Sequence, residues 1–433
     1  MTVRSAQGPQ KGEPARQPRL DWPSLIIRWV CLLWLGMMAA TWPLWWGQHE
    51  FPTIPYMPLI ESVSPLVDPL ATFTLLVGLL TGMVFPARKN WWCIPVLCGV
   101  CWLVLGSQQR LQPWVWHGGL IVLSWQLFPP RMASRWWLVI LVTIYVCSGI
   151  SKLDLAFAHE LGPTLLGGLL QSLGLGAMTR LWSPTIWHTL SLALPAGELL
   201  VGLFVAIPRT RTIGLILAII MHSLLISTLG PWGLNHSGGV ILWNISCAGI
   251  AFGLLAQHRQ LPRSIPQSES LTPNAGGLRT TPQPPPPVPA LARQLVMGSL
   301  LWLPAPLVLF DLGAPWTAWA VYSMRSEKVS LYLAEDDLQK LPPSLQKWVE
   351  PKLPEGPCAD LDHLYRLRLD QWSLATLHTP IPPQGSFTRS VLHEVSQRYS
   401  LDSPLIVSGS PPSRLTGARR WNCESTREST ASL

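Results

Sequence analysis

The sequence has little charge. Only 12% of its 433 residues are Asp, Glu, Lys or Arg, whereas 48% are hydrophobic. Soluble domains carry about 25% charged residues, so this balance excludes a soluble fold of this size and indicates a membrane protein. Aromatic residues other than tryptophan are also few, with 6 Tyr and 9 Phe beside 24 Trp. Trp favours the boundary between lipid and water, which agrees with a membrane location.

Further absences exclude other classes of function. No soluble segment interleaves basic and aromatic residues, so we predict no nucleic-acid partner despite a net charge of +8. Neither an internal repeat nor a pair of interrupted helices is found, which disfavours a transporter. The first 22 residues lack a short apolar core followed by a small-residue cleavage site, so we expect a retained tail rather than a cleaved signal peptide.

Nine apolar runs are long enough to cross about 30 Å of hydrocarbon at about 1.5 Å per residue. They cover residues 24–46, 66–86, 91–107, 112–130, 136–155, 183–207, 213–233, 238–256 and 293–310. The lipid bilayer is therefore the predicted surrounding of most of the chain.

Basic residues occupy every second loop between these runs. They are Arg4, Lys11, Arg16, Arg19, Arg88, Lys89, Arg131, Arg135, Arg209, Arg211, Arg259, Arg263, Arg279 and Arg293. The intervening loops contain only Arg110 and Arg180. Because short cytoplasmic loops carry an excess of Lys and Arg, we predict a cytoplasmic N-terminus, and nine crossings then place the C-terminus outside.

Composition divides the chain into six parts. We predict a basic cytoplasmic tail (1–23), an eight-helix transmembrane module (24–256), a Pro-rich cytoplasmic linker (257–292), a ninth transmembrane helix (293–310), an extracytoplasmic α+β domain (311–410) and a disordered tail (411–433). Residues 311–433 hold 27 of the 54 charges, so this part is expected to face water. The predicted fold class is an all-α polytopic membrane protein of about nine transmembrane helices with a small C-terminal extracytoplasmic α+β domain.

Local patterns predict the elements of that domain. The segments KVSLYLA and PLIVSG favour strands, and FTRSVLHEVSQRYS has the spacing of a helix. The segment HLYRLRLDQWSLATLH is interpreted as one long strand or two short ones.

Cysteines point to at most one disulfide. Six of the eight lie in apolar runs, and the other two, Cys358 and Cys423, could pair if their compartment is oxidising. Cys93, Cys98 and Cys101 have a spacing found in some iron–sulfur sites. They fall inside a segment of lipid-crossing length with no partner cysteine beside them, so we predict packing and no metal site.

Lys152 is an ionisable residue inside a predicted membrane span, a position that is energetically costly and needs a physical explanation. It lies 16 residues past Trp136, hence about 24 Å along the predicted span. Its stem could snorkel to the outer surface, or burial could favour the neutral amine and make it a base. Asp154 is two residues further on and points to another side of a helix, so it is not automatically the partner of Lys152.

Glu198 and His222 form the second candidate cluster. Each lies about 14 Å from the inner end of its predicted span, and the two spans are consecutive and antiparallel. We therefore expect the two side chains to pair, either to fix helix packing or to handle protons.

Polar residues at the outer ends of spans form the third group. Trp232, Asn235 and His236, in GPWGLNHSGG, are expected near the level of Lys152, as an interfacial turn or as part of a binding site. Arg110, in GSQQRLQPW, lies on the side that is otherwise nearly free of positive charge. It is interpreted as either a ligand for a bound cofactor or one half of a structural ion pair.

The motif around Lys152 resembles a known family. YVCSGISKLD is similar to the Y-x-x-A-G-x-x-K-L-D stretch of the vitamin K-dependent gamma-carboxylase and its bacterial relatives, the horizontally transferred transmembrane domain (HTTM) family. PAGELLVGLFVAIPRTRTIGLILAIIMHSLL is similar in layout to the next two helices of that family, including the histidine at His222. The likeness covers residues 20–330 loosely and 136–250 more specifically. A weaker resemblance, through G-x-x-K-L, is to small quinone-linked membrane proteins of the DoxX and MauE type.

The resemblance implies a function. In the carboxylase the motif lysine is the base that starts oxygenation of vitamin K hydroquinone, a role that would fall to Lys152, with Glu198 and His222 shaping or protonating the site. It also implies a reduced quinone or isoprenoid lipid as cofactor, for which Arg110 and the GPWGLNHSGG residues are candidates, and a bacterial inner membrane. Ser151 stands where the carboxylase has a second lysine. The hypothesis is a quinol-dependent oxygenase or carboxylase-like enzyme. The alternative is a non-catalytic membrane scaffold or quinone-associated accessory protein whose outer domain binds a protein partner.

Overall fold

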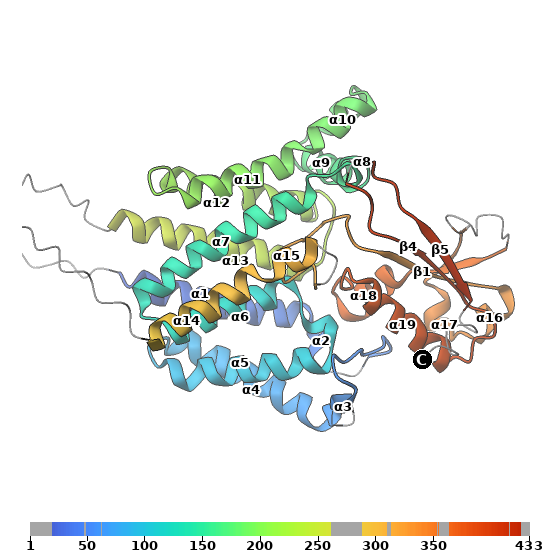
Figure 1. Cartoon of the computed structure of the whole chain (residues 1–433), viewed down its shortest axis with the longest axis horizontal. Coiled ribbons are helices and arrows are strands. Elements are labelled where there is room, and N and C mark those ends of the chain that lie inside the picture. Colours follow the sequence, from blue (N-terminus) through green and yellow to red (C-terminus); the bar gives the residue numbers. More distant parts are fainter. Residues whose placement is uncertain are drawn as a thin grey trace, which may run out of the picture.

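The apolar runs of the sequence fold as helices in a computed structural model of the chain. The structure describes residues 20–46, 49–61, 63–260, 288–309, 313–352, 354, 363–414 and 416–425. In these residues a bundle of long helices lies beside a small antiparallel sheet with its own helices (Figure 1). The predicted tail before residue 20 and residues 261–287 of the predicted linker lie outside the described residues.

Among the described residues, nine long helices form the bundle, and they run up and down its axis (Figure 1). They are α1 (Trp22–Ala40), α4 (Ser64–Val84), α5 (Lys89–Gly106), α6 (Pro113–Leu127), α7 (Pro130–Lys152), α11 (Ala193–Ala206), α12 (Arg211–Leu229), α13 (Gly238–Gln260) and α14 (Val288–Trp302). Short helices join or extend them: α2 (Trp42–Trp46), α3 (Pro58–Glu61), η1 (Gln108–Arg110), α8 (Leu155–His159), α9 (Leu161–Ser172), η2 (Gly176–Arg180), α10 (Pro184–Ser191) and α15 (Pro304–Leu309).

Within the described residues, eight helical segments are long and apolar enough to cross a membrane. They are Trp22–Ala40, Leu66–Val84, Lys89–Gly106, Pro130–Lys152, Pro184–Ala206, Arg211–Leu229, Gly238–Gln260 and Pro289–Val308. The fourth predicted span, 112–130, does not reach this length. Its helix α6 has 15 residues, about 22 Å, because Pro129 and Pro130 end one helix and start the next.

Helix α6 still returns the chain to the other end of the bundle. Lys89, at the start of α5, donates a hydrogen bond to the carbonyl of Phe128, just after α6, with Nζ···O 2.6 Å. Arg293, near the start of α14, donates to the carbonyl of Leu127 at 3.2 Å. Basic residues thus gather at the end of the bundle opposite the sheet (Figure 1), as the alternation of loops predicts.

Tryptophan is used in the core as well as at the surface. Trp34, Trp45, Trp92, Trp125 and Trp137 are each at most 1% exposed. These five therefore fill space between helices instead of facing outward, whatever their depth along the bundle. Large rings that are mostly apolar supply much of the contact area that holds such a bundle together.

Helix α7 approaches α11 closely at a glycine. A Cβ added at Gly149 would lie 2.7 Å from the Leu199 side chain and 2.9 Å from the carbonyl oxygen of Pro195. Small residues at such crossings let two backbones pack in direct contact. This contact sets α7 against α11 one turn before Lys152.

The sheet has five antiparallel strands in the order β2-β3-β1-β4-β5. The strands are β1 (Lys328–Leu333), β2 (Val349–Pro351), β3 (Tyr365–Leu367), β4 (Leu405–Gly409) and β5 (Trp421–Ser425). The helices of this domain are α16 (Glu335–Lys340), α17 (Pro343–Gln346), α18 (Leu369–Leu377) and α19 (Gly385–Arg398). The strands predicted in KVSLYLA and PLIVSG and the helix in FTRSVLHEVSQRYS are confirmed.

Two expectations for this domain are wrong in part. Residues 369–377, expected to be strand, form α18, which buries Leu369, Trp372 and Leu377 on one side. Residues 421–425, expected to be disordered, pair with β4, with Cys423 opposite Val407. Pairing satisfies the backbone of both strands. Cys423 is disulfide-bonded, and its expected partner Cys358 lies outside the described residues.

Candidate functional site

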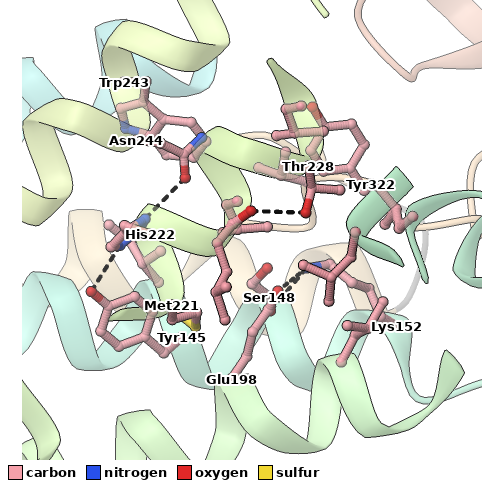
Figure 2. Close-up of a pocket in the computed structure, with 18 of the residues that line it drawn as sticks. Tyr145, Ser148, Lys152, Glu198, Met221, His222, Thr228, Trp243, Asn244 and Tyr322 are labelled. Atoms are coloured by element: carbon pink, nitrogen blue, oxygen red, sulfur yellow. Dashed lines mark hydrogen bonds and ion pairs between the residues drawn. The ribbon is translucent and has the colours of Figure 1, made fainter. Parts of the chain in front are cut away.

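A cavity of about 150 Å³ lies at the sheet-domain end of the bundle. Side chains of α7, α8, α9, α11, α12, α13 and the segment after α15 surround it (Figure 2). Most of its wall is apolar, and its polar residues are Tyr145, Ser148, Lys152, Glu198, His222, Thr228, Asn244 and Tyr322.

Lys152 and Glu198 form an ion pair in the wall of this cavity. The Lys152 ammonium donates to both carboxylate oxygens of Glu198, at 2.6 and 2.8 Å. The two side chains are only 6% and 14% exposed. The predicted pairing of Glu198 with His222 is therefore wrong, because Glu198 faces α7 rather than α12. Asp154 does not pair with Lys152; it caps α8 by accepting the Phe157 amide at 2.6 Å.

His222 belongs to a second polar group on the same cavity. Its Nδ1 lies 2.9 Å from Asn244 Oδ1, and its Nε2 lies 3.0 Å from the Tyr145 hydroxyl. Asn244 Nδ2 donates to the carbonyl of Val240, so its Oδ1 is the acceptor for His222. Nδ1 therefore carries a proton, and in a neutral imidazole Nε2 accepts from the Tyr145 hydroxyl.

Arg110 lies away from the cavity in a structural ion pair. Its guanidinium contacts Asp68 at 2.5 Å and donates to the carbonyls of Leu44 and Leu103. Trp102 donates to the other oxygen of Asp68 at 3.0 Å. Arg110 is 2% exposed, and its Nε and Nη1 are engaged in these contacts. Of its two interpretations the structural ion pair therefore fits, and Arg110 does not line the cavity. Its role as a cofactor ligand stays a prediction.

The GPWGLNHSGG residues have different positions. Trp232 is 66% exposed and does not line the cavity. Asn235 adopts a left-handed backbone with φ 49°, a conformation that Asn tolerates in turns. His236 touches the cavity wall only indirectly, since its Nε2 lies 3.3 Å from the Tyr322 hydroxyl.

Several residues of the site escaped prediction from the sequence. Tyr145 opens the YVCSGISKLD motif and precedes Lys152 by seven residues, which is two helical turns and the same face, so this signal was available. Asn244 is a polar residue within an apolar span. Tyr322 had no signal, because it reaches the cavity from the connection between α15 and β1.

His117, on α6, is a further buried polar group beside the site. Its Nδ1 accepts a hydrogen bond from Trp243, a cavity residue, at 3.1 Å. Its Nε2 finds no hydrogen-bond partner among the described residues, and its ring packs edge-on against Trp319 with centroids 6.0 Å apart.

The connection between α15 and β1 forms the outer wall of the cavity. Within it Val321 and Tyr322 line the cavity, and Ser323 Oγ donates to the carbonyl of Ser151 at 3.0 Å. Trp319 and Tyr322 have φ of 60° and 62°. Bulky residues in the left-handed region cost about 1–3 kcal/mol each and are held there only by their surroundings.

No family model, curated protein or solved structure matches this chain. The geometry therefore stands alone. It offers an apolar cavity with a buried amine–carboxylate pair on one side and an imidazole with a phenol on the other (Figure 2). Such a site can bind a flat apolar molecule with a hydroxyl group and accept its proton.

Proposed function

We propose that the protein is a quinol-dependent membrane enzyme, in which Lys152 takes a proton from a reduced quinone bound in the cavity. The observation that carries the proposal is the Lys152–Glu198 pair facing an apolar cavity inside a helical bundle. The resemblance of YVCSGISKLD to the gamma-carboxylase family adds the substrate class, a hydroquinone, with dioxygen as the oxidant. The proposed reaction is thus of the type that the HTTM and gamma-carboxylase family suggests.

The pair supports base chemistry without burying net charge. Transfer of one proton from the Lys152 ammonium to Glu198 leaves a neutral amine and a neutral carboxylic acid. The amine can then accept the hydroxyl proton of a quinol, which yields an ammonium beside a quinol anion. The total charge of the site is unchanged at each stage. This matters because a site of zero net charge costs less free energy in a membrane interior than an uncompensated charge does.

His222 completes the site on the opposite wall. Asn244 and Tyr145 fix its ring and its tautomer, and second-shell contacts of this kind orient a proton-handling imidazole. The Tyr145 hydroxyl, or His222 through it, would exchange a proton with the second oxygen of the quinol.

We also propose that the sheet domain faces the outside of a bacterial inner membrane. The basic helix ends lie at the opposite end of the bundle and would be cytoplasmic by the positive-inside rule. The disulfide of Cys423 supports the same orientation, since structural disulfides persist in oxidising compartments.

The test is oxygen uptake by the purified full chain in lipid nanodiscs supplied with reduced naphthoquinones. We expect turnover by the wild type and at least a hundredfold loss in Lys152→Ala, in the range that a general base contributes, about 10²–10⁴-fold. Lys328→Ala, at an exposed lysine on the same side of the molecule, should retain wild-type turnover.

Folding has to be separated from chemistry, because Lys152→Ala leaves Glu198 without its partner. The double variant Lys152→Met/Glu198→Gln removes both charges and should unfold close to the wild-type temperature while remaining inactive. Retained turnover in that variant contradicts the role of Lys152. Absence of uptake with any quinol in folded wild-type protein contradicts the enzymatic proposal and favours the accessory-protein alternative, in which the outer domain binds a partner.

A further inference from the structure

The segment 313–324, which connects α15 to the sheet domain, separates two spaces. Its residues Val321 and Tyr322 line the membrane cavity. Its residues Ala320 and Ser323, together with 313–315, line a polar cleft of about 770 Å³ between the bundle and the sheet domain. Neighbouring residues of one short segment thus face opposite ways, and the segment is the wall between cavity and cleft.

We propose that the connecting segment 313–324 is a lid that opens the Lys152 cavity to the outer aqueous side, with Tyr322 and Ser323 as its latches. The proposal concerns access to the same cavity as the proposed function, but it needs no quinol chemistry.

Few polar contacts join the lid to the bundle among the described residues, while Arg419 of the sheet domain donates to the carbonyl of Met324, the last residue of the lid, at 2.7 Å. The Tyr322 hydroxyl meets His236 Nε2 at 3.3 Å, and Ser323 Oγ donates to the Ser151 carbonyl at 3.0 Å. Both contacts join the lid to the bundle beside Lys152. Figure 2 shows Tyr322 and Thr228 on the Lys152 side of the cavity.

The lid also holds unfavourable backbone conformations in this position. Trp319 and Tyr322 both have left-handed φ values, which bulky residues rarely adopt. A segment that is strained when closed gains conformational freedom when it opens. Trp319 packs edge-on against His117 and is fully buried. Within the lid it is therefore suited to stay fixed while residues 320–324 move.

Space for the movement exists on the far side. The cleft borders Ala320 and Ser323, so there is space beside the segment into which it can move. Opening takes Val321, Tyr322 and Met324 out of their apolar contacts with the bundle. A lid over a site of proton transfer also excludes water while it is closed.

The test is the accessibility of a cysteine placed inside the cavity. Thr228→Cys puts a thiol at a cavity residue that is 4% exposed. Full-length protein in nanodiscs is treated with a charged methanethiosulfonate, which reaches the cavity only from water, and separately with N-ethylmaleimide, which also dissolves in lipid. Labelling above that of the chain without Thr228→Cys is measured over time.

The latch variants are Tyr322→Phe and Ser323→Ala, each combined with Thr228→Cys. Loss of one hydrogen bond should raise the rate of charged labelling about two- to tenfold. Tyr56→Phe, which makes the same chemical change at the cleft and not at the cavity, should leave the rate unchanged. As a control for folding, every variant should elute at the same volume as the wild type in size-exclusion chromatography.

Two outcomes overturn the lid. If Thr228→Cys with both latches intact is labelled as fast as the two latch variants, there is no closed state for the latches to hold. Labelling by N-ethylmaleimide alone, with the charged reagent excluded from every variant, shows that the cavity opens to lipid instead. Because neither result depends on oxygen uptake, failure of the lid and failure of the proposed enzyme can be told apart.

Discussion

At the scale of single residues, two buried ion pairs in the bundle differ in what else surrounds them. Arg110 and Asp68 are enclosed by backbone carbonyls and Trp102, so this pair fixes structure. Lys152 and Glu198 instead border a cavity. A buried ion pair is thus enclosed by protein at one place and borders open space at the other, and the proposed function gives only the second pair a part in proton transfer.

Asp337, in α16 of the sheet domain, gives a prediction of pH dependence. Burial by itself would raise the pKa of its carboxyl, but the amides of Asp402 and Ser403 and the Lys340 ammonium hold that pKa below the ordinary 3.8. A lowered pKa adds stability above the unfolded-state value, and this stability is lost as the pH falls through the folded-state value.

We therefore expect Asp337→Asn to lower the free energy of unfolding of the sheet domain by about 1–3 kcal/mol near neutral pH. The deficit should shrink as the pH falls below 3.8. Urea unfolding followed by tryptophan fluorescence measures both. The control is Asp336→Asn, at the exposed neighbour, which should unfold like the wild type. If Asp337→Asn lowers the free energy of unfolding by the same amount near neutral pH and below pH 3.8, the charge-based account is contradicted.

At the scale of elements, the site depends on how closely α7 packs against α11. Lys152 is on the first helix and Glu198 on the second, so a change in their separation changes the ion pair. At Gly149 the backbone of α7 lies close to α11, and there is no room for a Cβ beside Leu199 and Pro195. Gly197, on α11, has no atom within 4 Å of such a Cβ.

Gly149→Ala should therefore destabilise the protein by about 1–3 kcal/mol, the usual result of overpacking, and reduce quinol turnover by separating Lys152 from Glu198. Gly197→Ala is the matched control and should be neutral or slightly stabilising, because Ala is the better helix former by about 1 kcal/mol. Thermal unfolding in nanodiscs compares the two. Equal unfolding temperatures would mean that α7 and α11 are not held in close contact at Gly149.

At the scale of the whole molecule, the bundle has a basic end and an end that carries the sheet domain (Figure 1). Lys89 and Arg293 bind carbonyls after α6 at the basic end. Gln109, at the other end, donates to Ser373 of the sheet domain at 2.7 Å. The molecule is thus polarised along the bundle axis, as a protein oriented in a membrane would be.

The orientation can be tested with two exposed basic residues at opposite ends, Arg88 and Lys347. Each is replaced by Cys in turn, and a membrane-impermeant maleimide is added to intact cells. We expect labelling of Lys347→Cys only, and labelling of Arg88→Cys only after the membrane is permeabilised. The reverse pattern would place the sheet domain, with its disulfide, in the cytoplasm and contradict the proposed localisation.

Composition and local pattern suffice for the long apolar helices, for most of their limits and for a separate charged region with a small sheet, because each follows from the apolar or polar character of a short segment. The partners of buried groups do not follow in this way. Glu198 lies 46 residues from Lys152, and Asp68 lies 42 residues from Arg110. Which of them meet depends on the rotation and depth of packed helices, set by contacts such as that of Gly149. The same holds for Tyr322, which reaches the cavity only because the chain returns there after its last bundle helix.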